Sequence, residues 1–347
     1  MKVALPILSH TESASPLAGQ PTGPRDIRSV RTLRISVTDR CNFRCVYCMP
    51  EDKLDWTPKA SLLTFEEITT IAAAAIRHGI RGFKITGGEP LVRQELPRLI
   101  EMLNGLSDDL ELSMTTNGAL LVEHAESLRA AGLGRITISL DSLNPDTFER
   151  ITRGARLADV LAGIDAAVAA GFGRPKINCV AMRGVNDTEF PMFAAMTLDH
   201  DVSVRFIEYM PLGRTALGGE YERRFVPEPE IRSAIEARFG SLVPADPDSG
   251  SGPARVFRIA GGKGRIGFIS AMSRPFCETC NRLRLTAEGQ LRSCLFDGGE
   301  VELRPILREM GRETAASELH QAFVNCVAFK PEVHSYFGNR QMSQIGG

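Results

Sequence analysis

Three cysteines lie close together near the start of the chain, within the sequence CNFRCVYC at residues 41–48. Thiolates at the spacing C-x3-C-x2-C can converge from one loop, and no fourth Cys or His lies near this loop to complete a structural zinc site. A [4Fe–4S] cluster held by three thiolates keeps one iron open to a chelating amino acid, which is the starting point of radical S-adenosylmethionine (SAM) chemistry. The spacing therefore favours a SAM-binding cluster at Cys41, Cys45 and Cys48 over zinc or incidental buried thiols.

A second group of cysteines, Cys277, Cys280 and Cys294, has the spacing C-x2-C-x13-C. No fourth ligand stands at zinc-ribbon spacing, so the group favours a second cluster with one open iron over zinc. Arg282 and Arg284 lie between these ligands and alternate with leucines. Their guanidinium groups could hold a substrate against that open iron.

The segment Gly87-Gly88-Glu89-Pro90 ends a predicted strand and opens a predicted helix. The glycines would let a ligand approach the backbone closely, and Glu89 could accept from a ligand ammonium group or cap the turn. This segment is a weak signal alone and a strong one when it follows the first cysteine loop. No G-x4-G-K-[ST] phosphate loop occurs, and the glycine-rich residues 261–264 predict a hairpin turn instead.

The elements that must position these residues follow a regular alternation of strand and helix. One helix shows its boundaries clearly, with Thr64 as N-cap, Glu67 completing a capping box and Gly79 as the stop. Strands are predicted near residues 33–38, 80–86, 110–115, 135–140, 176–181 and 202–208, and helices near 64–78, 92–106, 120–131, 158–170, 189–198 and 230–239. Such alternation predicts an α/β fold with a parallel sheet and outer helices. Six units fall short of the eight in a closed barrel, so we expect a partial TIM-like barrel with an open side.

Three regions are expected along the chain. Residues 1–30 are rich in Pro, Ser, Thr and Gly without periodicity and predict a flexible arm. Residues 31–245 would form the partial barrel, with 211–229 as a loop that crosses its mouth. Residues 246–347 would carry the second cluster and part of the substrate site.

Polar side chains at the strand ends share one parity and so should point into the barrel. Glu208 and Met210 at the end of the last strand are expected to do the same. Arg34, Lys84 and Lys176 are the most informative of them, because a buried cation is costly unless it is paired or bound to a ligand. Three such residues converging on one cavity favour a polyphosphate.

The overall composition limits the classes of function. The chain has 347 residues and a net charge of −1, so no global field attracts nucleic acid or membrane. Six of its eight cysteines cluster as metal ligands do in a reducing compartment, whereas Cys179 and Cys326 stand alone. The apolar residues 3–8 are too few for a signal peptide or a membrane span. We therefore expect a cytoplasmic protein.

Taken together, these motifs resemble the MoaA family, the radical SAM GTP 3′,8-cyclases of molybdenum cofactor biosynthesis. The matching segments are residues 33–50, 84–93, 115–118, 138–143, 176–180, 206–213 and 277–295, together with the terminal Ile345-Gly346-Gly347. The resemblance implies a radical SAM partial barrel with two [4Fe–4S] clusters. It implies SAM contacts from Tyr47, Gly88, Glu89, Ser139 and Met210, and GTP contacts from Arg34, Lys84, Thr115, Lys176, Arg282 and Arg284. Gly346 and Gly347 would reach into the active site.

The resemblance also implies a lyase reaction. SAM cleavage would give a 5′-deoxyadenosyl radical that takes H3′ from GTP, and C3′ would then bond to C8 to give 3′,8-cyclo-7,8-dihydro-GTP. An external electron donor, a downstream enzyme that forms the cyclic pyranopterin and a homodimer are implied as well. The alternatives are a peptide-modifying radical SAM enzyme with an auxiliary cluster, which would share the first cluster and the GGEP segment but lack Arg282, Arg284 and the Gly-Gly tail, and a non-enzymatic iron–sulfur electron carrier.

Overall fold

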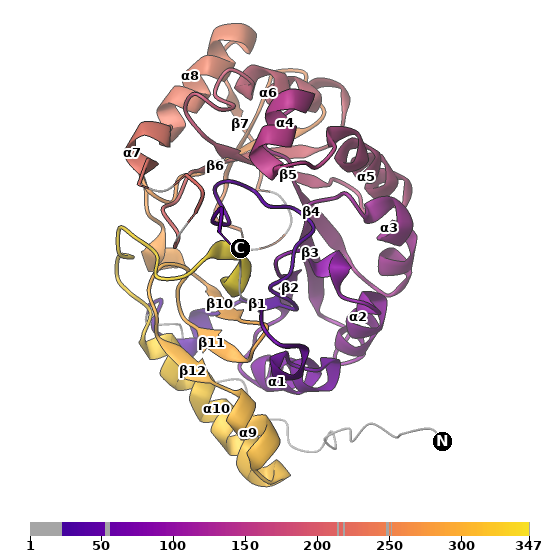
Figure 1. Ribbon diagram of the computed structural model, residues 1–347, viewed down its shortest axis with the longest axis vertical. Coiled ribbons are helices and arrows are strands. Elements are labelled where there is room, and N and C mark those ends of the chain that lie inside the picture. Colours follow the sequence, from indigo (N-terminus) through magenta and orange to yellow (C-terminus); the bar gives the residue numbers. More distant parts are fainter. Residues whose placement is uncertain are drawn as a thin grey trace.

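The computed structural model describes residues 23–52, 56–213, 215–217, 219–247, 250 and 252–346, apart from the side chains of 312 and 313. A curved wall of strands surrounds a central space, and helices cover its outer face (Figure 1). No helix among these residues is long and apolar enough to cross a membrane.

The wall is built on six parallel strands that follow one another in the sequence. They are β1 (Thr32–Ser36), β2 (Gly82–Thr86), β3 (Glu111–Thr116), β4 (Arg135–Ser139), β5 (Lys176–Ala181) and β6 (Ser203–Glu208). Each pairs with the next in parallel register. The intervening outer helices are α1 (Phe65–Arg77), α2 (Leu96–Asn104), α3 (Leu121–Ala130), α5 (Leu157–Ala169) and α6 (Phe190–Asp199). The predicted radical SAM type of partial barrel is confirmed in these units.

Local sequence signals account for most helix boundaries. The capping box at α1 is present, since Glu67 N–H donates to Thr64 Oγ1 at 3.1 Å and Thr64 N–H donates to Glu67 Oε2 at 2.7 Å. Helix α4 (Pro145–Thr152) was not predicted. Its signal was available, because Asn144 caps it and Pro145 occupies its first turn.

The C-terminal part of the chain extends the wall on both edges, which the sequence analysis did not predict. Strand β10 (Arg282–Leu285) pairs in parallel with β1, and β9 (Arg265–Ile269) pairs in parallel with β6. Outside them run the antiparallel strands β11 (Gln290–Arg292) and β12 (Glu300–Glu302) on one edge, and β8 (Arg255–Arg258) and β7 (Val243–Pro244) on the other. The described strands thus form a single sheet that ends at β12 and β7 without closing. The predicted hairpin at residues 261–264 joins β8 to β9.

The remaining helices pack around the C-terminal part and the barrel mouth. They are α7 (Tyr221–Arg224), α8 (Glu228–Phe239), α9 (Arg304–Glu309), α10 (Arg312–Ala328) and α11 (Met342–Ile345). The predicted mouth loop forms backbone hydrogen bonds to the cysteine loop, from Ala216 N–H to Met49 at 3.0 Å and from Leu217 N–H to Val46 at 3.3 Å.

The predicted N-terminal arm is shorter than 30 residues. Residues 1–22 lie outside the described part of the chain, whereas Ile27–Ser29 forms a 3-10 helix against α10. Ile27 and Val30 are buried, and Arg25 Nε donates to the Lys330 carbonyl at 2.8 Å. The prediction of a flexible arm is therefore wrong for residues 25–30, because the side chains of Ile27 and Val30 pack into the apolar core.

Alternation along each strand separates the core from the central space. In β1, Leu33 and Ile35 are fully buried beneath the outer helices, and Arg34 between them points to the opposite face. The apolar core therefore lies between wall and helices, and the polar face of the wall surrounds the centre.

Candidate active site

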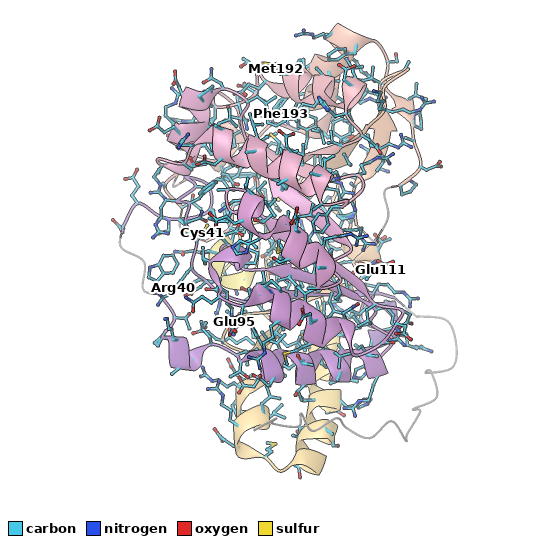
Figure 2. All side chains as sticks on the ribbon, turned by 90° about the vertical axis from the view of Figure 1, so that its right-hand side faces the viewer. Arg40, Cys41, Glu95, Glu111, Met192 and Phe193 are labelled. Carbon is cyan, nitrogen blue, oxygen red and sulfur yellow. The ribbon has the colours of Figure 1, made fainter. Side chains whose placement is uncertain are left out.

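The centre of the wall contains a cavity of about 280 Å³. Its lining includes twelve of the residues predicted to form the site: Arg34, Tyr47, Lys84, Thr115, Ser139, Lys176, Met210, Cys277, Cys280, Arg282, Arg284 and Cys294. Cys41 in the first cysteine loop and Glu111 at the start of β3 lie on opposite sides of the barrel (Figure 2), and Cys41, Cys45 and Cys48 are not among the described lining residues. The structure thus brings together residues from both halves of the chain.

Basic side chains dominate the cavity. Among the described lining residues seven are Lys or Arg, and the parallel register places Arg34 between Lys84 on β2 and Arg284 on β10. Burial and the neighbouring charges, of Arg34 above all, lower the pKa of Lys84 well below its usual value. Burial and the charge of Arg282 likewise lower the pKa of Arg34 to about 9. The cations repel one another, so a polyanion would stabilise the group.

The described lining residues include two acidic side chains and seven basic ones. Of the described lining residues only Glu111 and Asp141 are acidic. Glu111 accepts from Arg135 Nη2 at 2.7 Å. Asp141 accepts from the Tyr47 hydroxyl at 2.8 Å through one oxygen and from Val180 N–H at 2.8 Å through the other. Burial raises the pKa of Asp141 to about 6.

Two cavity cations, Arg135 and Arg205, were missing from the predicted site. The sequence reasoning gave β6 the wrong parity by placing Glu208 inward with Met210. In the structure Arg205 and Ile207 line the cavity, and Glu208 faces away to accept from the backbone of Met272 at 2.9 Å. Met210 still reaches the cavity because the chain has left the strand by then.

The first thiolate loop is held by hydrogen bonds within it and by others to the end of α4, where Val46 N–H donates to the Ile151 carbonyl at 2.9 Å and Arg44 N–H to the Thr152 carbonyl at 3.1 Å. The N–H groups of Cys48 and Met49 both donate to the Cys45 carbonyl at 3.0 Å, and Phe43 N–H donates to Cys41 Sγ at 3.3 Å. Burial raises the pKa of Cys41 to about 11 and that of Cys48 to about 12. Thiols in such surroundings become thiolates when a metal binds them.

The donor chemistry of the two cysteine sets fits clusters better than single ions. Nowhere in the described part of the chain do three His, Cys, Asp or Glu side chains gather closely enough to hold one metal ion. A [4Fe–4S] cluster requires wider spacing, because each thiolate binds a different iron. Three thiols around each site are the appropriate donors.

The GGEP segment makes a close contact within the chain at Gly88. Gly88 N–H donates to the Thr38 carbonyl at 2.7 Å, and a Cβ atom on Gly88 would collide with the carbonyl oxygens of Asp39 and Arg40. The glycine therefore allows close approach of the chain that leads into the cysteine loop. Neither Gly88 nor Glu89 lines the cavity.

Glu89 is buried and bonded to its own chain. It accepts from Thr116 Oγ1 at 2.7 Å, Asn117 N–H at 2.6 Å and Leu91 N–H at 3.0 Å, and burial raises its pKa to about 7. Asn117 Nδ2 in turn donates to Asn42 in the cysteine loop at 2.7 Å. Of the two roles considered for Glu89, this geometry corresponds to the turn cap, and it joins the ends of β2 and β3 to the first thiolate loop.

The second thiolate set lies among positive charges. Cys280 Sγ is 3.9 Å from Arg282 Nη2 and 3.5 Å from Lys330 Nζ. Burial raises the pKa of Cys280, but these two charges outweigh it and lower the pKa to about 7. Lys330 was not predicted, because it comes 50 residues after the cysteine that it contacts.

The C-terminal tail enters the barrel mouth, and Figure 1 places the chain end over the centre of the wall. Arg284 Nη1 donates to the Gly346 carbonyl at 2.5 Å and to the Ile345 carbonyl at 3.3 Å. Gly346 has φ +67°, and a Cβ atom there would collide with Thr86 Oγ1. Gly346 thus contacts Arg284 of the cavity lining, and Gly347 lies outside the described residues.

Comparison with known proteins agrees with this arrangement. Residues 35–196 match the Radical SAM superfamily, and residues 202–336 match Molybdenum Cofactor Synthesis C. The GTP 3′,8-cyclases of Pelotomaculum thermopropionicum and Geobacter sulfurreducens are each 44% identical, over 324 and 327 residues; the first comparison covers 92% of this chain and 98% of that one. Among solved structures, Streptococcus suis SuiB shares the fold at a TM-score of 0.53 and 12% identity, covering 88% of this chain and 67% of that one.

Proposed function

The chain belongs to the GTP 3′,8-cyclase family of radical SAM enzymes, and we propose that its cavity carries out this cyclisation between two iron–sulfur sites. One observation carries the proposal: seven basic side chains line a single cavity that is also lined by the second cysteine set and by Tyr47 of the first cysteine loop. The cations of the cavity would bind the phosphates of a guanosine triphosphate, and the bound nucleotide would extend between the two iron–sulfur sites. A peptide substrate would not require this charge.

The cationic wall is the proposed triphosphate site. Arg34, Lys84 and Lys176 are its proposed ligands, and we add Arg205 because it lines the same cavity. Phosphate oxygens would relieve the mutual repulsion of these groups through charge-assisted hydrogen bonds. Remote binding of this kind fixes the ribose and the base for reaction.

The guanine is proposed to lie between Arg282 and Arg284, beside the second cysteine set. Two buried polar atoms in the cavity support a polar ligand: Thr115 Oγ1 and Asn178 Oδ1 make no hydrogen bond within the described chain. Arg284 is held by the tail at Gly346, which would fix its guanidinium group against substrate.

The SAM site is proposed at the mouth, beside Cys41, Cys45 and Cys48. When bound, SAM and a cluster at these thiolates would supply the radical that takes H3′ from GTP; C3′ would then add to C8, and one further electron and a proton would close the product. The chain's own residues position and shield the reactants. Tyr47, fixed by Asp141, would orient SAM together with Ser139 and Met210, whereas Gly88 and Glu89 would support the loop that carries the cluster.

Further features of the family extend the proposal. We propose that residues 31–245 carry SAM, and that residues 246–347 carry a second [4Fe–4S] cluster at Cys277, Cys280 and Cys294 and complete the GTP site. An external electron donor, a homodimer, a cytoplasmic location and a downstream enzyme that converts the product to cyclic pyranopterin belong to the same proposal. The absence of a spanning helix among the described residues accords with the location.

The test is anaerobic reconstitution with iron and sulfide, followed by reaction with SAM, GTP and dithionite. We expect 5′-deoxyadenosine and 3′,8-cyclo-7,8-dihydro-GTP in equal amounts, and about eight irons per chain if both clusters are present. Cys294→Ala should retain about four irons and cleave SAM without cyclising GTP. A wild-type chain with four irons and one zinc would refute the proposal of a second cluster. Formation of 5′-deoxyadenosine without cyclised GTP would refute the proposal that GTP is the substrate.

A further inference from the structure

Lys330 places a buried ammonium group against the second cysteine set. Its Nζ lies 3.5 Å from Cys280 Sγ and donates to the carbonyls of Cys280 at 3.2 Å and Arg282 at 2.7 Å. The residue is 2% exposed and follows the end of α10. Three contacts therefore fix the charge beside one sulfur, out of contact with solvent.

The segment that begins at Lys330 also contacts the other two cysteines of the set. The backbone of His334 hydrogen-bonds to Cys277. Ser335 N–H donates to Asp297 Oδ2 at 2.9 Å, and this oxygen lies 4.0 Å from Cys294 Sγ. Residues 330–335 thus wrap the second set, and Lys330 is the group in this segment that brings a full positive charge to a sulfur.

The first cysteine set has different surroundings. The hydrogen bonds to Cys41 Sγ come from neutral amides, Phe43 N–H at 3.3 Å and Asn117 Nδ2 at 3.9 Å. Asp141 acts on both Cys45 and Cys48, while Glu89 and Arg44 act on Cys41 and Arg153 acts on Cys48. Acidic and basic groups thus lie near both sets, and the sets differ in the ammonium group that contacts a sulfur, Lys330 Nζ at 3.5 Å from Cys280 Sγ.

This difference matters for electron transfer, because reduction adds negative charge to an iron–sulfur cluster. Positive charge and hydrogen bonds at the sulfurs stabilise the reduced form and raise the reduction potential. We propose that Lys330 is a positioning residue that holds Cys280 and raises the reduction potential of the second cluster. The proposal rests on the proposed function, since it requires a cluster at Cys277, Cys280 and Cys294.

The experiment compares three replacements of Lys330 in anaerobically reconstituted full-length protein. Lys330→Met removes the charge and the donor, Lys330→Gln keeps a donor without charge, and Lys330→Arg keeps the charge. Lys263→Met, in the exposed turn between β8 and β9, is the matched control for loss of a lysine. Potentials are read by electron paramagnetic resonance during redox titration, and the second-cluster signal is the one missing from Cys294→Ala.

We expect Lys330→Met and Lys330→Gln to lower the second-cluster potential, with Lys330→Arg and Lys263→Met close to wild type. The oxidised-to-reduced ratio at a fixed potential should rise on the order of tenfold, which is 59 mV for one electron. The first-cluster potential should not move. Unchanged potentials in Lys330→Gln with all irons retained would overturn the inference, as would equal shifts in both clusters. A wild-type chain lacking the second signal would instead refute the proposed function.

Discussion

Lys84 offers a test of the cavity in which binding and stability should change in opposite directions. Its ammonium group donates to Thr137 Oγ1 at 3.1 Å and stands beside Arg34 in the register, with Arg205 and Lys176 also near enough to lower its pKa. Without an anionic ligand the charge is repelled by its neighbours. With a triphosphate present, the same charge becomes a favourable contact.

We expect Lys84→Met to weaken GTP binding by roughly 1.5–3 kcal/mol, the range for a hydrogen bond to a charged group, or about 10- to 100-fold in affinity. Guanosine has no phosphate and should bind almost unchanged. In the absence of ligand, the free energy of unfolding should rise by about 1 kcal/mol, because a poorly compensated cation is removed. This value is at the low end of the free-energy cost of burying a polar group, because the ammonium group of Lys84 still faces the cavity.

The pH dependence has a definite sign. The pKa of Lys84 is lowered on folding, so between that lowered value and the ordinary 10.5 the unfolded chain binds the extra proton. The ligand-free wild type should therefore gain stability as pH rises through this window, and Lys84→Met should lack that gain. GTP affinity should fall over the same window, because phosphate binds the protonated form.

The assay is denaturant unfolding of the reconstituted protein with no ligand, with guanosine and with GTP, using Lys263→Met as the surface control. Ligand stabilisation follows RT ln(1 + [L]/Kd), so a 10- to 100-fold loss of affinity removes about 1.4–2.7 kcal/mol of the GTP effect. Equal losses for guanosine and GTP, or a less stable ligand-free variant, would contradict the placement of Lys84 at the phosphates.

Three further outcomes are expected. Cys41→Ala should abolish 5′-deoxyadenosine formation, because one of only three thiolates is lost; normal yield by chromatography would refute the first-cluster assignment. Glu89→Gln should lower the free energy of unfolding by about 1–3 kcal/mol in urea, because its amide nitrogen would face the Asn117 N–H as a second donor; unchanged stability and iron content would remove Glu89 from the support of the loop. Deleting Gly346 and Gly347 should leave iron content and GTP affinity within a few-fold but reduce cyclised product per 5′-deoxyadenosine, since Arg284 loses the Gly346 carbonyl; full coupling would show that the tail is dispensable.

The features that could be predicted from the sequence are those that depend on neighbours in the chain. The turn of the first cysteine loop is one, because its hydrogen bonds to the Cys45 carbonyl join residues three and four apart, whereas the bonds that fix the loop against Ile151 and Thr152 are long-range. The capping box at Thr64 and the alternation along β1 are others, since both follow from the local periods of helix and strand. These local patterns sufficed for the six units of the barrel and for the family resemblance.

The features that only the tertiary structure decided join segments far apart in the chain. Strand β10 pairs with β1, and an open sheet edge can hydrogen-bond to any extended segment. The four residues of β10 therefore do not specify by themselves which strand they pair with. That pairing places Arg284 beside Arg34, and the tail then reaches Arg284 from 62 residues away. The contact of Lys330 with Cys280 arises in the same way. Spacing within one loop therefore determined the cofactor chemistry, whereas long-range strand pairing and packing determined which charges surround it.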